Sequence, residues 1–192
     1  MEEKITWKIL RSKLGNLIGG TTSKGCCLLE FVDRRSLNTI ISKMEQRYKM
    51  HFVHGTSSIL EKLQEELNEY FDGSRNQFSV PLDVRGTPFQ MSVWSQLLSI
   101  PYGETRSYND IAKSIKNETA VRAVGRANGD NNIGIVIPCH RVIASDGNLQ
   151  GYGGGLWRKK ELLTLEESFK SNFSQNSRSI PDPTTLDNWL YH

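Results

Sequence analysis

The chain has 192 residues, which predicts one or two domains, and 24 Lys and Arg against 21 Asp and Glu give a formal net charge of +3. Hydrophobic residues make up 37% and charged residues 23%, which excludes a disordered polyelectrolyte, a collagen-like fibre and a disulfide scaffold. The net charge is too small to indicate a nucleic-acid partner, so evidence for one must come from particular residues.

Two strands and a helix are predicted in the first fifty residues. Short apolar runs at 5–10 and 28–32 flank a stretch rich in Gly, Thr and Ser at 19–25. This pattern is typical of strands joined by a hairpin turn. Apolar residues at helical spacing then predict a helix over 37–48.

A second helix and a boundary follow. Ser58 and Glu61 have the spacing of a capping box, and the apolar residues after them share one helical face as far as Phe71. Alternating apolar residues at 78–84 predict a strand. Gly and Pro in the RGTP sequence at 85–88 interrupt both kinds of regular structure, so we expect a domain boundary there.

The pattern beyond the boundary is helical. An apolar stripe predicts a helix over 89–98, a capping pattern predicts one over 108–115, and a third, capped by Asn117 or Thr119, runs to about residue 128. Two short helices with a tight connection resemble a helix-turn-helix. Many helical domains contain such a pair, so ordinary packing stays an alternative to DNA binding.

The last part of the chain contains one more buried segment and one more helix. An apolar run predicts a buried extended strand at 133–137, and a last helix is expected over 156–167. The polar sequence after it predicts a loosely ordered tail, although Trp189, Leu190 and Tyr191 could dock on the body. The expected parts are an N-terminal α/β domain (1–85), a second domain (86–168) and a tail (169–192).

The cysteine pattern indicates the cellular compartment. Cys26, Cys27 and Cys139 are an odd number with a vicinal pair, which argues against a secreted disulfide framework and for a reducing compartment. No apolar run is long enough to span a membrane, and the first residues lack the apolar centre of a signal peptide. We therefore expect a cytoplasmic protein, or a nuclear one in a eukaryotic cell, without a membrane partner.

Cys139 is the candidate nucleophile. It follows the predicted strand and Pro138 and precedes His140 and Arg141, whose charges would favour the nucleophilic thiolate. The alternative is a buried thiol that packs as a small hydrophobe.

His140 is the candidate base. Neighbouring side chains in extended chain point to opposite faces, so His140 would act on Cys139 through a bridging water. An acid would then be needed to orient the ring. Glu166 is a candidate, but nothing local distinguishes it from Glu161 or Glu167.

The sequence PCHRV at 138–142 resembles the active-site signature of the O6-alkylguanine-DNA alkyltransferases, or methylated-DNA–protein-cysteine methyltransferases. The resemblance also covers GTPFQMSVW (86–94), IPYGETRSY (100–108), AVRAVGRANG (120–129) and DGNLQGYGGGLWRKKELLTLE (146–166). It implies an α+β fold. The N-terminal part would be a mixed α/β, ribonuclease-H-like domain, and the C-terminal part a mainly helical domain with a winged helix-turn-helix-like DNA-binding unit.

The resemblance also implies the chemistry. Cys139 would take the alkyl group from O6-alkylguanine in double-stranded DNA in an irreversible, single-turnover reaction by a monomer. His140 would help to deprotonate Cys139, and Glu166 would orient His140. Asn131 would brace this network, and Tyr108 would assist the leaving guanine with a hydrogen bond or a proton.

The resemblance further places a set of residues against the DNA and the flipped base. They are Arg122, Ala123, Gly125, Arg141, Tyr152, Gly153 and Gly154. Arg122 would fill the gap left by the extrahelical base, because a base in duplex DNA must leave the stack to react. The small residues of that helix would allow close approach to DNA, with tight helix packing as the alternative. Asn132 departs from the family, which often has proline there.

Neither a cofactor nor a metal is expected. Cys26, Cys27, His51 and His54 are the nearest metal-ligand candidates in the N-terminal part, but their spacing matches no standard zinc pattern. Two other functions stay open. One is a lesion-binding protein that performs no transfer, which the presence of Cys139 disfavours. The other is a cysteine hydrolase, which would require an oxyanion hole and an activated water.

Overall fold

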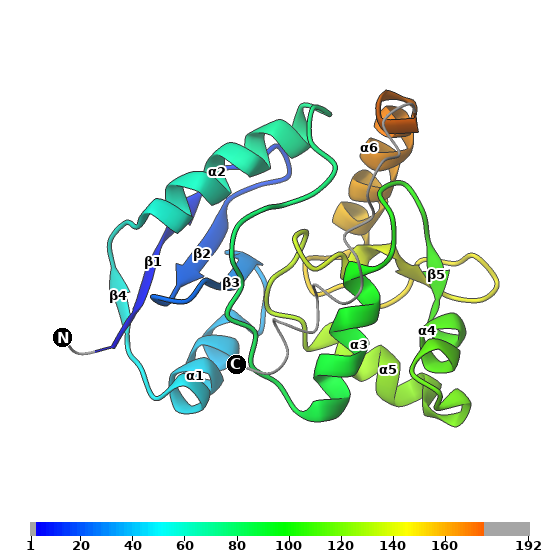
Figure 1. Ribbon diagram of the computed structural model, residues 1–192, viewed down its shortest axis with the longest axis horizontal. Coiled ribbons are helices and arrows are strands. Elements are labelled where there is room, and N and C mark those ends of the chain that lie inside the picture. The colour runs from blue at the N-terminus through cyan, green and yellow to red at the C-terminus, as the bar shows by residue number, and fades with distance from the viewer. Residues whose placement is uncertain (1–2, 175–192) are drawn as a thin grey trace.

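A four-stranded sheet with helices on both faces forms the N-terminal part of the chain in the computed structural model, which describes residues 3–174 (Figure 1). Its elements are β1 (Ile5–Leu10), β2 (Leu17–Thr21), β3 (Cys26–Phe31), α1 (Leu37–Tyr48), β4 (Phe52–His54) and α2 (Ser58–Phe71). The strand order is β3-β2-β1-β4. The pairs β1–β2 and β2–β3 are antiparallel, and β4 is parallel to β1.

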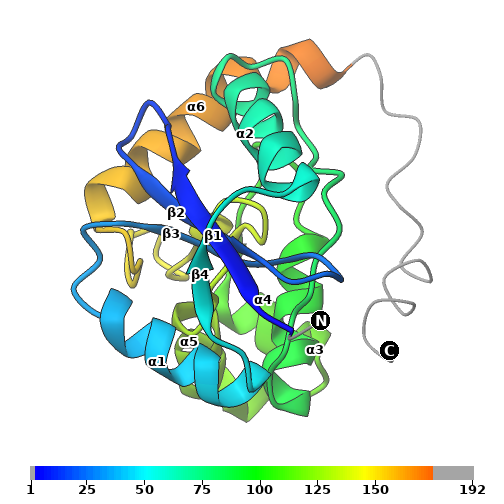
Figure 2. The same ribbon diagram turned by 90° about the vertical axis from the view of Figure 1, so that its left-hand side faces the viewer.

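The two faces of this sheet bury different helices. Leu17 and Ile18 are neighbours on β2 and therefore point to opposite faces. Ile18 belongs to the cluster that packs against Ile40 of α1, whereas Leu17 belongs to the cluster that contains Leu60 of α2. Figure 2 shows the strands running between the two helices. The predicted helix over 37–48 is confirmed.

The glycines that were expected in the first turn lie partly in a strand. Gly19 and Gly20 belong to β2, and the turn is restricted to residues 22–25. The reason is packing. A Cβ on Gly19 would lie 2.7 Å from a methyl carbon of Leu10, and one on Gly20 would lie 3.1 Å from Leu28. These glycines let the flanking strands and side chains approach closely.

The predicted strand at 78–84 is wrong. Only Leu82 forms a bridge, and it pairs with Cys26 outside any named strand. The Cys26 amide donates to the carbonyl of Pro81 (2.8 Å), and the Asp83 amide donates to the carbonyl of Cys26 (2.9 Å). Proline has no amide hydrogen, so a continuous ladder cannot form through this segment. It is an extended linker between the two parts of the chain.

The C-terminal part is mainly helical. Its elements are α3 (Pro88–Leu98), β5 (Arg106–Ser107), α4 (Tyr108–Ser114), α5 (Val121–Gly129), β6 (Val142–Ile143) and α6 (Leu156–Ser174). Capping boxes begin α3 and α4, as the sequence predicts for α4. The indole nitrogen of Trp94 on α3 donates to the carbonyl of Ala127 on α5 (2.8 Å), which fixes the two helices together.

Two predicted helix caps are wrong. Ser57 rather than Ser58 caps α2, and its hydroxyl accepts from the Leu60 amide (3.2 Å). Neither Asn117 nor Thr119 caps α5, because a 3-10 turn at Glu118–Ala120 precedes it. The Thr119 hydroxyl bonds the Asn117 side chain instead (3.3 Å).

The predicted strand at 133–137 is also wrong. The Gly134 amide donates to the carbonyl of Leu29 on β3 (2.8 Å), and the chain then turns so that the Ile137 amide donates to Ile133 (2.9 Å). Ile135 has a φ of +70°, a left-handed conformation that interrupts extended chain. The segment is buried, as expected, but it docks on the edge of β3 as a turn.

The last helix is longer than predicted. α6 continues to Ser174, beyond the expected end at 167 and into the expected tail. Phe173 stacks edge-on against Tyr102, with ring centroids 5.2 Å apart, which explains the extension. Trp189, Leu190 and Tyr191 lie outside the described residues. Within residues 3–174, no helix is both long and apolar enough to cross a membrane.

One hydrophobic core joins the two parts. The cluster that contains Leu29 and Phe31 of β3 continues through Val93 of α3 and Val124 of α5 to Cys139. The sheet and the helical part are therefore packed against each other, and Cys139 lies where they meet.

Candidate active site

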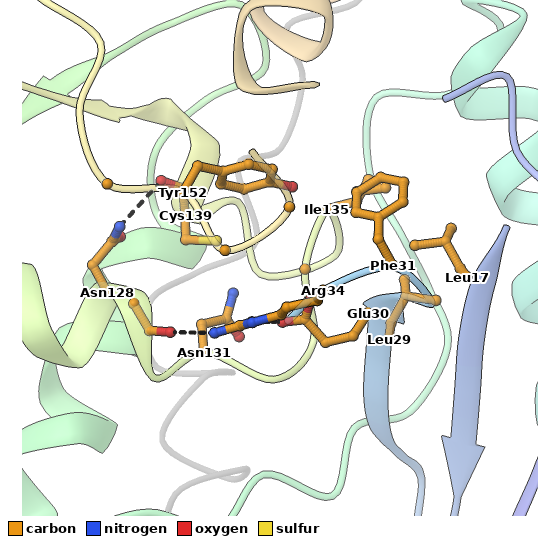
Figure 3. A pocket seen from close by; sticks show the side chains of 15 residues that line it. Leu17, Leu29, Glu30, Phe31, Arg34, Asn128, Asn131, Ile135, Cys139 and Tyr152 are labelled. Carbon is orange, nitrogen blue, oxygen red and sulfur yellow. Dashed lines mark hydrogen bonds and ion pairs between the residues drawn. The ribbon is translucent and has the colours of Figure 1, made fainter. Parts of the chain in front are cut away.

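Cys139 lies in a pocket at the junction of the two parts (Figure 3). It is the first residue of a 3-10 turn, Cys139–Arg141, and its side chain is almost buried. Its backbone is held from both sides, because its amide donates to the carbonyl of Ile137 (2.8 Å) and its carbonyl accepts from the Asn128 side chain (3.4 Å). The thiol is thus on a rigid turn, which suits a positioned nucleophile.

The surroundings of Cys139 do not stabilise a thiolate in the way that the sequence suggests. Burial raises the pKa of the Cys139 thiol to about 11, although a hydrogen bond from Asn131 and the charge of Lys159 act in the opposite direction. The expected contribution of His140 and Arg141 is wrong, because both side chains are directed to another partner, Glu166. The resting group is a thiol, so a base must take its proton when it reacts.

His140, the residue after Cys139, forms a buried pair with Glu166. Nε2 of His140 lies 2.8 Å from Oε1 of Glu166, and both side chains have no exposed surface. Nδ1 of His140 has no hydrogen-bond partner among residues 3–174. The structure thereby selects Glu166 over the exposed Glu161 and Glu167 as the acid that contacts the ring.

The protonation states of this pair follow from burial and charge. Burial lowers the pKa of His140 below its ordinary value, which outweighs the opposing effect of Glu166. Burial alone would raise the pKa of Glu166, but His140 and Arg141 lower it well below its usual range. A neutral imidazole beside a charged carboxylate is the arrangement that a general base needs.

Glu166 is the centre of a larger network. Its carboxylate accepts from Nε and Nη2 of Arg141 (2.9 Å each), from the Tyr70 hydroxyl (2.7 Å) and from the Gly103 amide (3.0 Å). Nη1 of Arg141 donates to the carbonyl of Ile100 (2.6 Å). This buried position of Arg141 contradicts its expected contact with DNA, because its guanidinium is used to fix Glu166.

Tyr70 was not found from the sequence. It lies on α2, in the N-terminal part, and reaches a residue on the last helix. Its apolar neighbours on α2 indicate a core position, and no local signal marks its hydroxyl as a partner of Glu166.

Asn131 braces the turn that leads to Cys139. Its amide nitrogen donates to the carbonyl of Ile137 (2.8 Å), and its amide oxygen accepts from the Ile133 amide (3.0 Å). Both bonds lie within the buried segment that precedes the nucleophile. Asn131 also lines the pocket, as Figure 3 shows.

A buried lysine holds the loop beside the pocket. Nζ of Lys159 donates to the carbonyls of Val142 (2.5 Å) and Gln150 (2.6 Å), and the Tyr108 hydroxyl donates to the same Gln150 carbonyl (3.2 Å). Burial lowers the pKa of Lys159 to about 8. Tyr108 thus lies next to the loop at 150–154, although its ring is not part of the pocket lining. Lys159 was not found from the sequence, where only its place in the motif distinguishes it.

The glycine-rich loop forms one wall of the pocket. Gly151, Tyr152, Gly153 and Gly154 all line it. A Cβ on Gly154 would lie 2.7 Å from the ring of Phe31, so this glycine is required for the close contact with β3. The loop is therefore a fixed wall rather than a free turn.

The outer face of α5 is open to solvent. Arg122 and Ala123 are exposed, whereas Ala127 is buried in the core. Gly125 faces α4, where a Cβ would lie 3.9 Å from the ring of Tyr108. The small residues of α5 therefore have different roles at different positions. Ala127 allows tight packing in the core, whereas Ala123 leaves the exposed face of the helix flat.

The N-terminal metal-ligand candidates are directed to different partners. The Cys26 thiol donates to the carbonyl of Leu28 (3.5 Å), and the Cys27 thiol to that of Gly20 (3.4 Å). His54 stacks on the ring of Trp7. Among residues 3–174, no group of three His, Cys, Asp or Glu side chains has the arrangement of a metal site.

Comparison with known proteins gives consistent matches. Residues 88–168 match the family model of the DNA-binding domain of 6-O-methylguanine DNA methyltransferase. The methylated-DNA–protein-cysteine methyltransferase of Mycobacterium tuberculosis is 50% identical over 135 residues, which are 69% of this chain and 82% of that protein. The inducible enzyme of that name from Bacillus subtilis is 40% identical over 167 residues, which are 86% of this chain and 92% of that protein.

Solved structures match the whole described fold. The crystal structure of M. tuberculosis O6-methylguanine methyltransferase superposes with a TM-score of 0.73 at 39% identity, covering 95% of this chain and 99% of that one. A structure of the same mycobacterial protein in complex with DNA gives the same TM-score, identity and coverage. The mixed α/β fold with a helical C-terminal part is thus shared with these proteins.

Proposed function

The chain belongs to the methylated-DNA–protein-cysteine methyltransferase family, and on this premise we propose that Cys139 is the residue that accepts the alkyl group. The protein binds DNA and repairs alkylation by transferring the alkyl group to a protein cysteine. The observation that carries the assignment is the position of the three cysteines. Cys139 lines a pocket, whereas Cys26 and Cys27 are sealed in the core of the sheet.

The proposed lesion is O6-alkylguanine in double-stranded DNA. The Cys139 sulfur forms a bond to the alkyl carbon while the bond from that carbon to guanine O6 breaks, and the bonding electrons leave with the guanine. The thiol proton passes through an intervening water to Nδ1 of His140. Tyr108 assists the leaving guanine by donating a hydrogen bond or a proton. The thioether is stable to water, so each molecule reacts once.

The buried pair supports this order of events. The raised pKa of Cys139 keeps the thiol protonated at rest, and the lowered pKa of His140 keeps the imidazole free to take a proton. Glu166 bonds Nε2, so the ring presents Nδ1 as its unpaired nitrogen. The imidazolium that forms would be stabilised by the charge of Glu166.

The proposed DNA-binding surface is the helix pair α4 and α5. Arg122 and Ala123 are on the exposed face of α5, and Asn128 and Gly129 at its end line the pocket. A base flipped from the duplex would therefore travel a short way along α5 to reach Cys139, while Arg122 fills its place in the stack.

Several finer features remain proposals. We propose a ribonuclease-H-like arrangement for the sheet with α1 and α2, and a winged helix-turn-helix for α4 and α5 with the β5–β6 pair. The division near residue 85 is supported by the family match, which begins at 88. A monomeric state and a cytoplasmic location, or a nuclear one in a eukaryotic cell, are expected from the sequence alone.

The test is transfer to a defined cysteine. The protein is incubated with a duplex that contains one O6-methylguanine, and intact and peptide masses are measured. We expect one methyl group on the peptide that holds Cys139, with a plateau at one equivalent. Cys139→Ala should bind the duplex without a mass change, and Cys27→Ala is the matched control that should still react.

The other outcomes identify the alternatives. Binding of the lesion without a mass change in the wild-type protein would show a lesion-binding protein. Turnover beyond one equivalent would show a hydrolase-like cycle. A methyl group on Cys26 or Cys27 would refute the assignment of Cys139.

A further inference from the structure

The pocket around Cys139 has a wall that comes from the N-terminal part of the chain. This wall lies outside residues 88–168, the range of the family match. Its residues come from β2, β3 and the turn after β3, and they are Leu17, Leu29, Glu30, Phe31 and Arg34. Figure 3 shows them across the pocket from Cys139 and Tyr152. Two of the five are charged, which is unusual for a wall that lies against a buried thiol.

Arg34 spans the pocket between its two other walls. Nη2 donates to the carbonyl of Gly129 at the end of α5 (3.0 Å). The guanidinium also lies close against the glycine-rich loop, because a Cβ on Gly153 would be 2.5 Å from Cζ of Arg34. The side chain therefore occupies the space between the end of the DNA-binding helix and the loop.

Two neighbours hold Arg34 in this position. Nη1 pairs with the carboxylate of Glu30, which is 5% exposed and also lines the pocket. Nε donates to the hydroxyl of Ser36 (3.1 Å). A planar guanidinium with three fixed contacts loses little further freedom when it forms a pocket wall, so it acts as a rigid boundary.

We propose that Arg34, held by Glu30, is a specificity-determining residue that limits the size of the alkyl group that Cys139 can accept. The inference rests on the function proposed above. A methyl group needs little space beside the sulfur. A larger group must displace the guanidinium from Gly129 and Gly153 and leave Glu30 buried without its partner, which is costly.

The experiment compares two alkyl groups in one sequence context. Duplexes that differ only in the O6 substituent, methyl or benzyl, are reacted under single-turnover conditions, and alkylation of the Cys139 peptide is followed by mass. For Arg34→Ala we expect the ratio of the benzyl to the methyl rate constant to rise about tenfold, within the range of steric discrimination by a pocket. Arg35→Ala is the matched control, since Arg35 is exposed on the same turn and should leave the ratio unchanged.

A ratio separates specificity from folding, because general damage lowers both rate constants together. If Arg34→Ala is unstable, the double variant E30Q/R34A takes its place, because it also removes the carboxylate that Arg34→Ala leaves unpaired. It should show the same rise in the ratio of the benzyl to the methyl rate constant. An unchanged ratio in both variants, or an equal rise in Arg35→Ala, would overturn the inference. If wild-type protein fails to methylate Cys139 at all, it is the proposed function that fails.

Discussion

Replacing Glu166 by glutamine should remove a large part of the free energy of unfolding of this protein. Oε1 accepts from His140, Arg141 and Tyr70, and Oε2 accepts from Arg141 and Gly103. The glutamine NH2 group is a donor, so it faces at least two other donors in either orientation. The buried guanidinium of Arg141 also loses its countercharge.

The magnitude follows from this geometry. Breaking a buried ion pair by removing one partner costs about 3–5 kcal/mol. Total stabilities are about 5–15 kcal/mol, so the loss is a large fraction of the whole. With an m-value of about 2 kcal/mol/M, the urea midpoint should fall by about 2 M. The assay is equilibrium urea unfolding at pH 7.5, followed by circular dichroism.

Glu167→Gln is the matched control, because Glu167 is the exposed neighbour on the same helix. Its free energy of unfolding should stay within about 0.5 kcal/mol of the wild-type value, as for most surface substitutions. A loss of less than about 1 kcal/mol in Glu166→Gln would equal no more than one ordinary hydrogen bond, and it would show that the buried network around Glu166 contributes little to stability.

Two further predictions concern pH and DNA. Burial lowers the pKa of His140 in the folded protein, so the imidazole of the unfolded chain is protonated first as the pH falls. The free energy of unfolding of the wild type, relative to that of His140→Asn, should therefore fall as the pH drops from 7.5 to 5.5. The slope below pH 6.5 should be at most about 1.4 kcal/mol per pH unit. A difference between the two that is constant across these urea titrations would contradict a lowered pKa. Arg122→Ala should slow methyl transfer from duplex by at least about tenfold, since unstacking a base costs a few kcal/mol, yet spare transfer from free O6-methylguanine. Arg126→Ala is the exposed control, and equal loss on both substrates would reject the base-flipping role.

Helices were predicted from the sequence more successfully than strands. The apolar stripes of α1, α2 and α3 each pack into one core, and a period of 3.6 residues is visible over about three turns. The apolar runs at 78–84 and 133–137 were mistaken for strands. Both segments are largely apolar, but Pro81 and the left-handed Ile135 prevent continuous pairing with a neighbouring strand. A run of apolar residues indicates burial, but it does not show whether the buried segment is a strand.

The nucleophile could be proposed from the sequence because its neighbours are local. Pro138, Cys139 and His140 are consecutive, so their chemistry can be considered without a fold. The direction of the Cys139 pKa could not be obtained in this way, because desolvation depends on what covers the thiol. The charge of Arg141 was likewise assigned to the wrong partner, since adjacency in sequence does not give the direction of a side chain.

The sequence by itself determined the helices, the family and the motif that carries Cys139, because these depend on spacing within short segments. The resemblance to the family already implied Glu166 as the partner of His140, but only the tertiary structure decided which other residues bind Glu166 and which residues close the pocket. Glu166 lies on the buried face of α6 and contacts His140, whereas Glu161 and Glu167 lie on the exposed face. Tyr70 and Arg34 reach the site from the other half of the chain. Contacts between residues so far apart in sequence arise from packing, and no local pattern encodes them.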